Sequence, residues 1–359
     1  MSKIAVIGSG SWGIALAEHI AREGHDVIIW SFTEEEKNDI NINRKTNYIP
    51  KLTINERIHC SNSLEEVVKN AEIILHVTPS KFTRNVFNQY KEFVGNKPVI
   101  LCSKGFDTEN LQTLDNIFEE ELPGIRLGVL SGPSFAIEVV NKIPTAIILA
   151  SKDDELLSEV SKILSSETMR IYKSHDVLGV EIGGALKNII AFCCGIVAEL
   201  GLGTNASSAI ITRGLAEIAR LGVEMGASKD TFYGLSGLGD LILTCSSDES
   251  RNRRAGRLIG KGLSIDEIKK EAEIGYFLKK DSWSQGYMTE VVTKLCQLSF
   301  EEFGLKQLSI ITHLENQASQ KVALKSGFSL VRQFKGSDRY TRKMRDYLEF
   351  RYIKGEFNE

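Results

Sequence analysis

The clearest chemical signal in this sequence is a glycine loop close to its beginning. Gly8-Ser9-Gly10-Ser11-Trp12-Gly13 fits the pattern GxGxxG, directly after the apolar segment 3–7 and at the start of a helical pattern at 12–23. There the first glycine permits a tight turn, the second lets the backbone approach a pyrophosphate, and the third allows close helix–strand packing. The N–H groups at the helix start would bind the phosphates. The alternative is a glycine-rich turn without a ligand.

The choice between NAD and NADP stays open at this stage. The second apolar segment, HDVIIW at 25–30, should end near the adenosine ribose, where an acid favours NAD and an arginine favours NADP. Trp30-Ser31-Phe32-Thr33 is followed by Glu34, Glu35 and Glu36. This segment meets neither rule cleanly.

Alternating strand and helix signals fill the first 150 residues. Continuous apolar runs occur at 3–7, 25–30, 71–77, 97–103, 129–133 and 145–151. Such runs are typical of strands that are buried on both faces of a parallel sheet. We therefore expect an α/β fold whose N-terminal domain is a doubly wound, Rossmann-type sheet.

The pattern changes near residue 178. Helical patterns follow at 179–200, 207–226 and 249–261, and after about 274 come a strand-like run at 305–312, a helix at 316–327 and strand-like pieces to the end. We expect three domains: a dinucleotide-binding domain at 1–177, an all-α substrate domain at 178–274 that is truncated, and a partial α/β tail at 275–359.

Composition excludes several classes of function. Lys plus Arg is 44 and Asp plus Glu is 47, so the net charge is −3 and a nucleic-acid partner is not expected. Only four apolar residues, Ile4 to Ile7, precede the glycines, and the apolar stretch Ile189 to Ala198 is too short to span a membrane. We predict no membrane insertion and interpret that stretch as a buried helix.

The cysteines and histidines carry no ligand pattern. The six cysteines show no CxxC spacing, which favours reduced thiols in a cytoplasmic protein. The six histidines show no ligand spacing, and we predict no metal.

Eight ordered segments resemble one family, the soluble NAD(P)-dependent glycerol-3-phosphate dehydrogenases. They are GSGSWGIALA (8–17), NRKTNYIP (43–50), HVTPS (76–80), SKGF (103–106), SGPSFAIEV (131–139), ALKNIIA (185–191), LSGLGDLILTC (235–245) and SRNRRAGRLIGKG (250–262). The resemblance covers about 1–274. It implies reversible hydride transfer between NAD(P)H and dihydroxyacetone phosphate, supplying glycerol 3-phosphate for phospholipid synthesis. It also implies a small phosphorylated triose or glycerol substrate and leaves a homodimer open.

The resemblance implies three catalytic residues. Lys187 would be the base that removes the hydroxyl proton, Lys104 would touch substrate and cofactor, and Asp240 would contact the substrate hydroxyl and orient the base. A lysine with its ordinary pKa of about 10.4 is a poor base, but burial and a cation such as Lys104 can lower that pKa by about 3–5 units. The alternatives are a snorkelling lysine at a helix end and an aspartate that caps a helix.

The same resemblance assigns binding residues. The phosphate end of the substrate would be held by Ser250, Arg251 and Asn252, since a guanidinium suits a phosphate dianion. We interpret Arg253, Arg254 and Arg257 as a solvated helix face. The substrate would also be approached by Gly132 and Ser134. The cofactor would be bound by Gly8, Gly10, Ser11, Trp12, Gly13, Lys104, Ala136 and Arg251.

The resemblance breaks near Ile274-Gly275, where the family would continue with a Val-Val-Glu-Gly segment whose acid contacts the cofactor. Segments 274–292 and 315–328 resemble the second half of GNAT-type N-acetyltransferases, with an acyl-CoA loop around Ser284 to Tyr287. Three hypotheses follow. The chain is an active dehydrogenase, it is a fusion remnant that binds nucleotide without turnover, or its tail is a transferase that uses acetyl-CoA.

Overall fold

The structure, a computed structural model, describes residues 1–107, 110, 112–263, 289–290, 292–293, 296, 307–337 and 344–353. The chain divides into two compact units. The first unit is Met1–Ile190 with Ala209–Glu249, and the second unit is Ala191–Ser208 with Ser250–Glu359. The sequence-based division into three domains stays a prediction.

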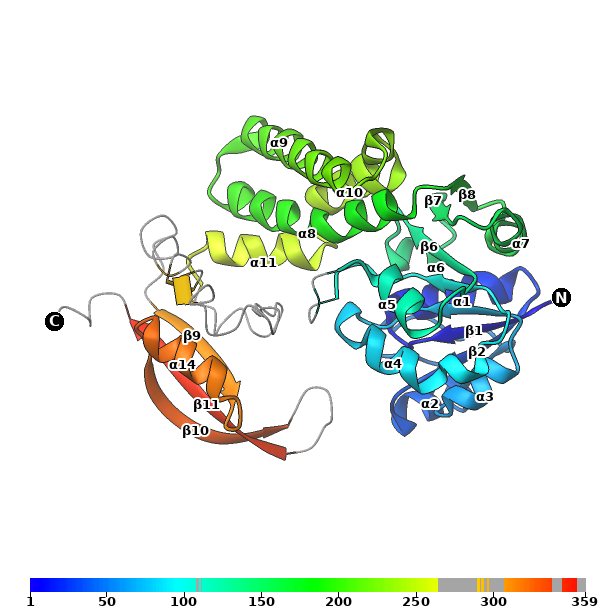
Figure 1. Ribbon diagram of the computed structural model, residues 1–359, viewed down its shortest axis with the longest axis horizontal. Coiled ribbons are helices and arrows are strands. Elements are labelled where there is room, and N and C mark those ends of the chain that lie inside the picture. The colour runs from blue at the N-terminus through cyan, green and yellow to red at the C-terminus, as the bar shows by residue number, and fades with distance from the viewer. Residues whose placement is uncertain are drawn as a thin grey trace. The chain divides into compact units, whose positions relative to one another are not determined.

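The first unit is built on an eight-stranded sheet (Figure 1). Its strands are β1 (Lys3–Ile7), β2 (Asp26–Trp30), β3 (Ile58–Ser61), β4 (Ile73–His76), β5 (Val99–Leu101), β6 (Leu127–Ser131), β7 (Thr145–Ala150) and β8 (Met169–Ser174). The spatial order is β3-β2-β1-β4-β5-β6-β7-β8, and only the β6–β7 pair is antiparallel. The doubly wound sheet is confirmed. From β1 the chain first builds the sheet in one direction through β2 and β3, and it then continues on the other side of β1 with β4. Sheets of this kind bind ligands at this switch point, beside the carboxyl ends of the strands.

Helices cover both faces of this sheet. They are α1 (Ser11–Arg22), α2 (Glu34–Asn41), α3 (Leu64–Lys69), α4 (Thr83–Tyr90), α5 (Leu114–Glu121), α6 (Ala136–Val140) and α7 (Asp154–Leu164), with 3₁₀ turns η1 (Ser80–Phe82) and η2 (Lys91–Phe93). One core cluster lies under α1 and α7, and a second lies under α3, α4 and α5. In β1, Ile4 and Val6 belong to the first cluster while Ala5 and Ile7 belong to the second. This two-sided burial explains why the strands read as unbroken apolar runs.

The helical part of the chain follows the sheet. It comprises α8 (Val177–Glu199), α9 (Gly203–Glu224), the 3₁₀ turn η3 (Lys229–Tyr233), the π-helical turn η4 (Leu235–Gly239), α10 (Asp240–Ser246) and α11 (Arg251–Gly260). Among the described residues, α8 alone is long and apolar enough to cross a membrane by length and composition, and 61% of its most apolar window is buried in the protein. Buried core helices meet the same criteria. The helix expected at Ile189 to Ala198 is present but only partly buried, because Ile189 is 62% exposed.

The described end of the chain forms a small sheet in the second unit. Strands β9 (Gln307–His313), β10 (Ser329–Ser337) and β11 (Met344–Ile353) pair antiparallel in the order β10-β11-β9, with helix α14 (Gln317–Lys325) between β9 and β10. The Asn316 side chain caps α14 by accepting a hydrogen bond from the Ser319 N–H at 3.1 Å. The expected strand and helix are therefore present. The expected acyl-CoA loop at Ser284 to Tyr287 lies outside the described residues.

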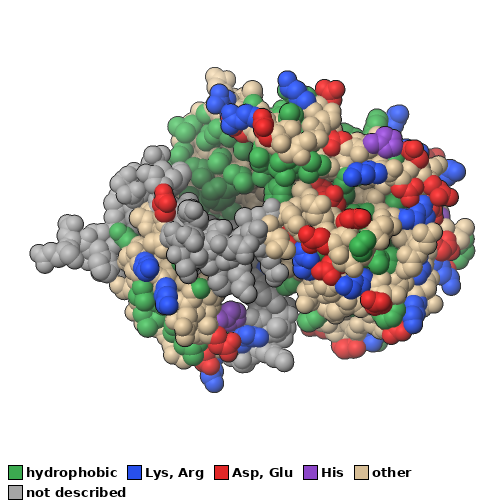
Figure 2. Space-filling model, viewed as in Figure 1, with side chains coloured by type: hydrophobic (Ala, Val, Ile, Leu, Met, Phe, Trp, Pro, Cys, Tyr) green, Lys and Arg blue, Asp and Glu red, His purple; other side chains and the backbone are tan. Residues whose placement is uncertain are grey.

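Charged side chains are spread over the first unit. Figure 2 shows acidic and basic groups interspersed on the visible face of this unit, at the right of the view. The pattern accords with the small net charge of the chain.

The glycine loop provides a test of the packing of α1 on β1. A Cβ at Gly13 would lie 2.0 Å from the Gly8 carbonyl oxygen, whereas a Cβ at Gly10 would meet nothing within 4 Å. We expect Gly13→Ala to lower the free energy of unfolding by about 1–3 kcal/mol because of overpacking. The matched variant Gly10→Ala should change it by less than about 1 kcal/mol, because Gly10 has φ −67° and ψ 175°, which any residue adopts. Urea unfolding measures both, and equal losses would contradict the packing argument.

Candidate active site

The glycine loop lies at the reversal point of the sheet. Gly8 has φ +126°, a conformation that favours glycine, and a Cβ there would come within 3.0 Å of the Val77 carbonyl oxygen, just beyond β4. Helix α1 begins at Ser11 after Gly10, which provides no side-chain cap for the first N–H groups. The space over Gly10 is open. The loop therefore fits a dinucleotide pyrophosphate, which the uncapped N–H groups would bind.

Three charged residues from distant parts of the chain meet in the first unit. Lys187 lies on α8, Asp240 is the first residue of α10, and Lys104 follows β5. Lys187 Nζ donates to Asp240 Oδ1 at 2.5 Å, and Lys104 Nζ donates to Asp240 Oδ2 at 2.6 Å. Asp240 is only 1% exposed. Each oxygen of a buried carboxylate is thus paired with an ammonium group, as burial of a charge requires.

Two glycines on α8 allow this cluster to form. A Cβ at Gly184 would lie 2.8 Å from Ser131 Oγ and 3.4 Å from Lys104 Cγ, and a Cβ at Gly183 would lie 2.7 Å from the Ser236 carbonyl oxygen. The helix therefore approaches the end of β6 and the η4 turn more closely than a residue with a side chain would permit. Lys187 follows one turn later and is held beside Asp240.

Burial changes the acidity of Lys187. The pKa of the Lys187 ammonium is lowered to about 8. Removal from water is the largest cause, the positive charge of Lys104 acts in the same direction, and Asp240 opposes both effects. Lys187 is 7% exposed, so the snorkelling alternative does not describe it. The expected cationic neighbour is present at the expected residue.

A fourth residue of this cluster, Thr244, was not foreseen. Thr244 Oγ1 accepts a hydrogen bond from Lys187 Nζ at 2.8 Å and donates one to the Asp240 carbonyl oxygen at 2.6 Å. Asp240 and Thr244 are four residues apart on α10 and so share a helix face, and that spacing was the signal in the sequence. Asp240 does not cap the helix, because the cap position is Gly239.

The Ser-Gly-Pro-Ser segment adjoins Lys104. The Gly132 carbonyl oxygen accepts hydrogen bonds from Lys104 Nζ and from Ser134 Oγ, each at 3.1 Å. Ala136 begins α6, and Ala136 and Trp12 both pack against the core cluster under α1. The structure therefore brings Gly132 and Ser134 next to Lys104, and their approach to the substrate stays a prediction.

The expected phosphate-binding residues lie in the second unit. Ser250 is the N-cap of α11, and its Oγ accepts a hydrogen bond from the Arg253 N–H at 3.2 Å. Arg251 and Asn252 are exposed on the first turn of α11. The solvated interpretation suits Arg254, which is exposed. Arg253 is partly buried, and Arg257 donates from Nε to Glu199 Oε2 at 3.0 Å while its side chain stays 38% exposed.

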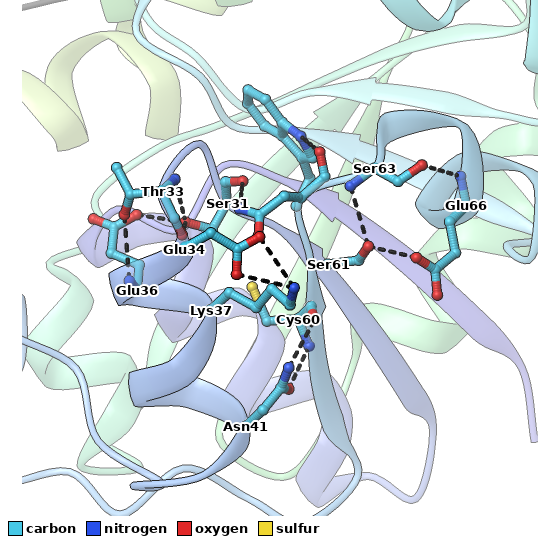
Figure 3. A network of polar contacts seen from close by, with 12 residues as sticks. Ser31, Thr33, Glu34, Glu36, Lys37, Asn41, Cys60, Ser61, Ser63 and Glu66 are labelled. Carbon is cyan, nitrogen blue, oxygen red and sulfur yellow. Dashed lines mark hydrogen bonds and ion pairs between the residues drawn. The ribbon is translucent and has the colours of Figure 1, made fainter. Parts of the chain in front are cut away.

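The end of β2 carries a polar network, part of which is drawn in Figure 3. This network also reaches the glycine loop through Ser9. Glu36 Oε2 accepts hydrogen bonds from Ser9 Oγ at 2.8 Å and from Ser31 Oγ at 2.6 Å. Tyr48 OH donates to Glu36 Oε1 at 3.1 Å. The sequence placed three acids here without indicating which of them faces the loop.

A dinucleotide loop at the reversal point of a Rossmann sheet and a buried lysine with a lowered pKa together indicate an oxidoreductase that uses a nicotinamide cofactor. Comparisons with known proteins identify the family. Two family models match, described as the N-terminus and the C-terminus of NAD-dependent glycerol-3-phosphate dehydrogenase, over residues 3–157 and 176–300. The chain belongs to the NAD-dependent glycerol-3-phosphate dehydrogenase family.

Relatives and solved structures agree with this assignment. The chain is 45% identical over 278 residues to glycerol-3-phosphate dehydrogenase [NAD(P)+] of Fusobacterium nucleatum, covering 76% of this chain and 83% of the relative. The crystal structure of glycerol-3-phosphate dehydrogenase from Coxiella burnetii is 34% identical, with a TM-score of 0.73, over 82% of this chain and 89% of the other. The yeast enzyme, from Saccharomyces cerevisiae, is 30% identical, with a TM-score of 0.66, over 84% and 91%.

The comparisons correct the expected end of the resemblance. The C-terminal family model runs through Ile274-Gly275 and continues to residue 300. The comparisons therefore give no support to a fusion at that point or to the N-acetyltransferase resemblance of the tail.

Two substitutions should move the pKa of Lys187 in opposite directions. Lys104→Met removes a positive neighbour and should raise this pKa above about 8, whereas Asp240→Asn removes a negative neighbour and should lower it. The measurement is a pH titration of the Lys187 side-chain NMR signal, assigned by its loss in Lys187→Arg. Shifts in the same direction, or no shift in either variant, would contradict the electrostatic account.

Proposed function

We propose that this chain interconverts glycerol 3-phosphate and dihydroxyacetone phosphate, with Lys187 as the proton-transfer residue. One observation carries the proposal: Lys187 is buried, has a pKa lowered to about 8, and is held by Asp240 and Thr244. Oxidation of a secondary alcohol needs a base at the hydroxyl group while hydride leaves the carbon. The relatives are named for glycerol-3-phosphate dehydrogenase activity with NAD(P)+.

The hydrogen bonds of Lys187 explain how it would act. In its neutral form the amine has two N–H groups, and Asp240 Oδ1 and Thr244 Oγ1 provide an acceptor for each. The lone pair then remains available for the substrate hydroxyl proton. A nicotinamide cofactor held by the glycine loop would supply the hydride acceptor or, in the reverse direction, the hydride donor. In the reverse direction the Lys187 ammonium returns the proton to the carbonyl oxygen.

Lys104 and Asp240 would stabilise charge during the reaction. The Asp240 carboxylate, which accepts a hydrogen bond from Lys187 Nζ, would compensate the ammonium that forms on Lys187. Lys104 Nζ contacts both Asp240 Oδ2 and the Gly132 carbonyl oxygen, so its position is fixed at the site. A fixed cation there favours negative charge that develops on the substrate oxygen, and preorganisation of this kind accounts for much of enzymatic catalysis.

We infer that Arg251 and Asn252 bind the substrate phosphate. Both are exposed at the first turn of α11, where Ser250 caps the helix. A guanidinium offers two parallel N–H donors to a phosphate, and a helix N-terminus adds partial positive charge. Ser250 would contribute mainly by fixing this turn, because its hydroxyl already accepts the Arg253 N–H.

A cytoplasmic location is supported by the cysteines. All six lie in described positions, none forms a disulfide, and five are buried. Free thiols of this kind are typical of a reducing compartment. A homodimer stays a prediction.

Lys187→Ala is the direct test of the proposed base. It should lower kcat for NADH or NADPH oxidation with dihydroxyacetone phosphate by about 10²- to 10⁴-fold, the usual contribution of a positioned acid or base. The absorbance at 340 nm measures the rate. Lys152→Ala, an exposed lysine in the same unit, is the control and should behave as wild type. A folded wild-type protein that binds cofactor without turnover would instead support the remnant hypothesis.

Arg251→Ala and Arg254→Ala form a matched pair on one helix. Loss of a charged hydrogen bond costs about 1.5–3 kcal/mol, so Arg251→Ala should raise KM for dihydroxyacetone phosphate roughly 10- to 100-fold. Arg254→Ala removes the same charge three residues away and should leave KM within about twofold. Steady-state kinetics at fixed ionic strength measure both. Equal effects would mean that net charge, rather than a phosphate contact, determines KM.

A further inference from the structure

The Glu36 carboxylate lies where a Rossmann fold reads the adenosine ribose. It follows β2, the strand next to β1, and its Oε2 accepts a hydrogen bond from Ser9 Oγ inside the glycine loop at 2.8 Å. In such folds the group at this place contacts the ribose 2′ position. The contact with Ser9 therefore ties the carboxylate to the cofactor loop, although the sequence alone left three neighbouring acids equivalent.

The Glu36 side chain does not take the conformation that its place at the start of α2 would favour. Thr33-Glu34-Glu35-Glu36 has the sequence of a capping box, in which the glutamate would return to the N–H of the threonine. Thr33 does cap α2, with its Oγ1 accepting the Glu36 N–H at 3.3 Å. The Glu36 carboxylate instead turns to Ser9 and Ser31, and the Thr33 N–H meets Ser31 Oγ at 3.4 Å. Figure 3 shows Glu36 beside Ser31 and Thr33.

Three donors hold the carboxylate in this place. Ser9, Ser31 and Tyr48 provide one hydrogen bond each, and a carboxylate has about four acceptor positions. One further hydroxyl donor, such as a ribose 2′-OH, would fill the remaining acceptor position of the Glu36 carboxylate. Glu36 is only partly buried and so can be reached by a ligand.

The first three basic residues after Glu36 in the sequence are each engaged in other contacts. Lys37 pairs with Glu34 at 3.1 Å, and Lys45 pairs with Asp39 at 3.4 Å. Arg44 donates to the Ile58 carbonyl oxygen at 2.7 Å. A 2′-phosphate at this place would therefore meet the negative charge of Glu36 where NADP-dependent enzymes provide an arginine.

We propose that Glu36, fixed by Ser9, Ser31 and Tyr48, makes this dehydrogenase select NAD(H) over NADP(H). The carboxylate accepts a hydrogen bond from the ribose 2′-OH and repels a 2′-phosphate. The nearby Phe32, with 64% of its surface exposed, offers an apolar face to the adenine ring. The inference rests on the proposed function for its catalytic readout and on the glycine loop alone for its binding readout.

The experiment compares NADH with NADPH on wild type, Glu36→Gln and Glu35→Gln. Glu35 is the adjacent exposed acid on α2, so its variant removes the same charge without the contact to Ser9. Fluorescence titration without substrate gives the two dissociation constants, and the 340 nm assay gives kcat/KM. We expect wild type to prefer NADH by at least about 30-fold, since juxtaposed like charges cost several kcal/mol. Glu36→Gln should reduce this ratio at least about tenfold through tighter NADPH binding, and Glu35→Gln should keep it within about twofold.

The outcomes separate this inference from the proposed function. Equal wild-type affinity for the two cofactors, or an unchanged ratio in Glu36→Gln, would overturn the assignment of Glu36. A clear preference for NADH in the titration without any turnover would support the assignment and count against the proposed function alone. Glu36→Asp retains the charge with a shorter side chain, and it should keep rejecting NADPH even if Glu36→Gln proves unstable.

Discussion

The buried charge of Asp240 is the constraint on which the site depends. A carboxylate that is 1% exposed is tolerated only when both oxygens have strong partners, and Lys187 and Lys104 supply them. These two lysines come from α8 and from the segment after β5, so the ion pairs fix two distant segments against α10. Burial of Lys187 against Asp240 is the largest cause of its lowered pKa, and the nearby positive charge of Lys104 lowers that pKa in the same direction. The packing of these segments and the lowered pKa of Lys187 therefore follow from the same buried arrangement.

Glycine supplies the second condition, which is close approach. Gly13 permits α1 to lie on the Gly8 carbonyl, and Gly184 permits α8 to lie over Lys104 and Ser131. In both places a missing Cβ brings a helix to a functional segment, the cofactor loop in one case and the lysine–aspartate cluster in the other. The first case is visible in the sequence because GxGxxG has a known context. The second is not, since two glycines inside an apolar helix have no such signature.

The sequence predicted what depends on local pattern. Strand β1 was predicted with its exact bounds, because a short apolar run followed by glycines has few other interpretations. Strands β3 and β8 were missed, since IHCS and MRIYKS carry too few buried apolar residues to be recognised. Thr244 and Glu36 were missed for a different reason. The spacing of Asp240 and Thr244 places both on one helix face, but it does not identify the distant partner Lys187. In the same way, the three neighbouring acids do not show that Glu36 is the one that contacts Ser9.

The lowered pKa of Lys187 also affects the stability of the folded protein. Its pKa is about 8 in the folded protein and near 10.5 when it is exposed to water, so the folded state binds fewer protons between these pH values. Because folding lowers the pKa of Lys187, this residue destabilises the folded protein at pH below about 8. The destabilisation is relieved as the pH rises toward 10.5. Its size is on the order of 3 kcal/mol. Two separate core clusters under the helices of the Rossmann sheet supply the burial that offsets it.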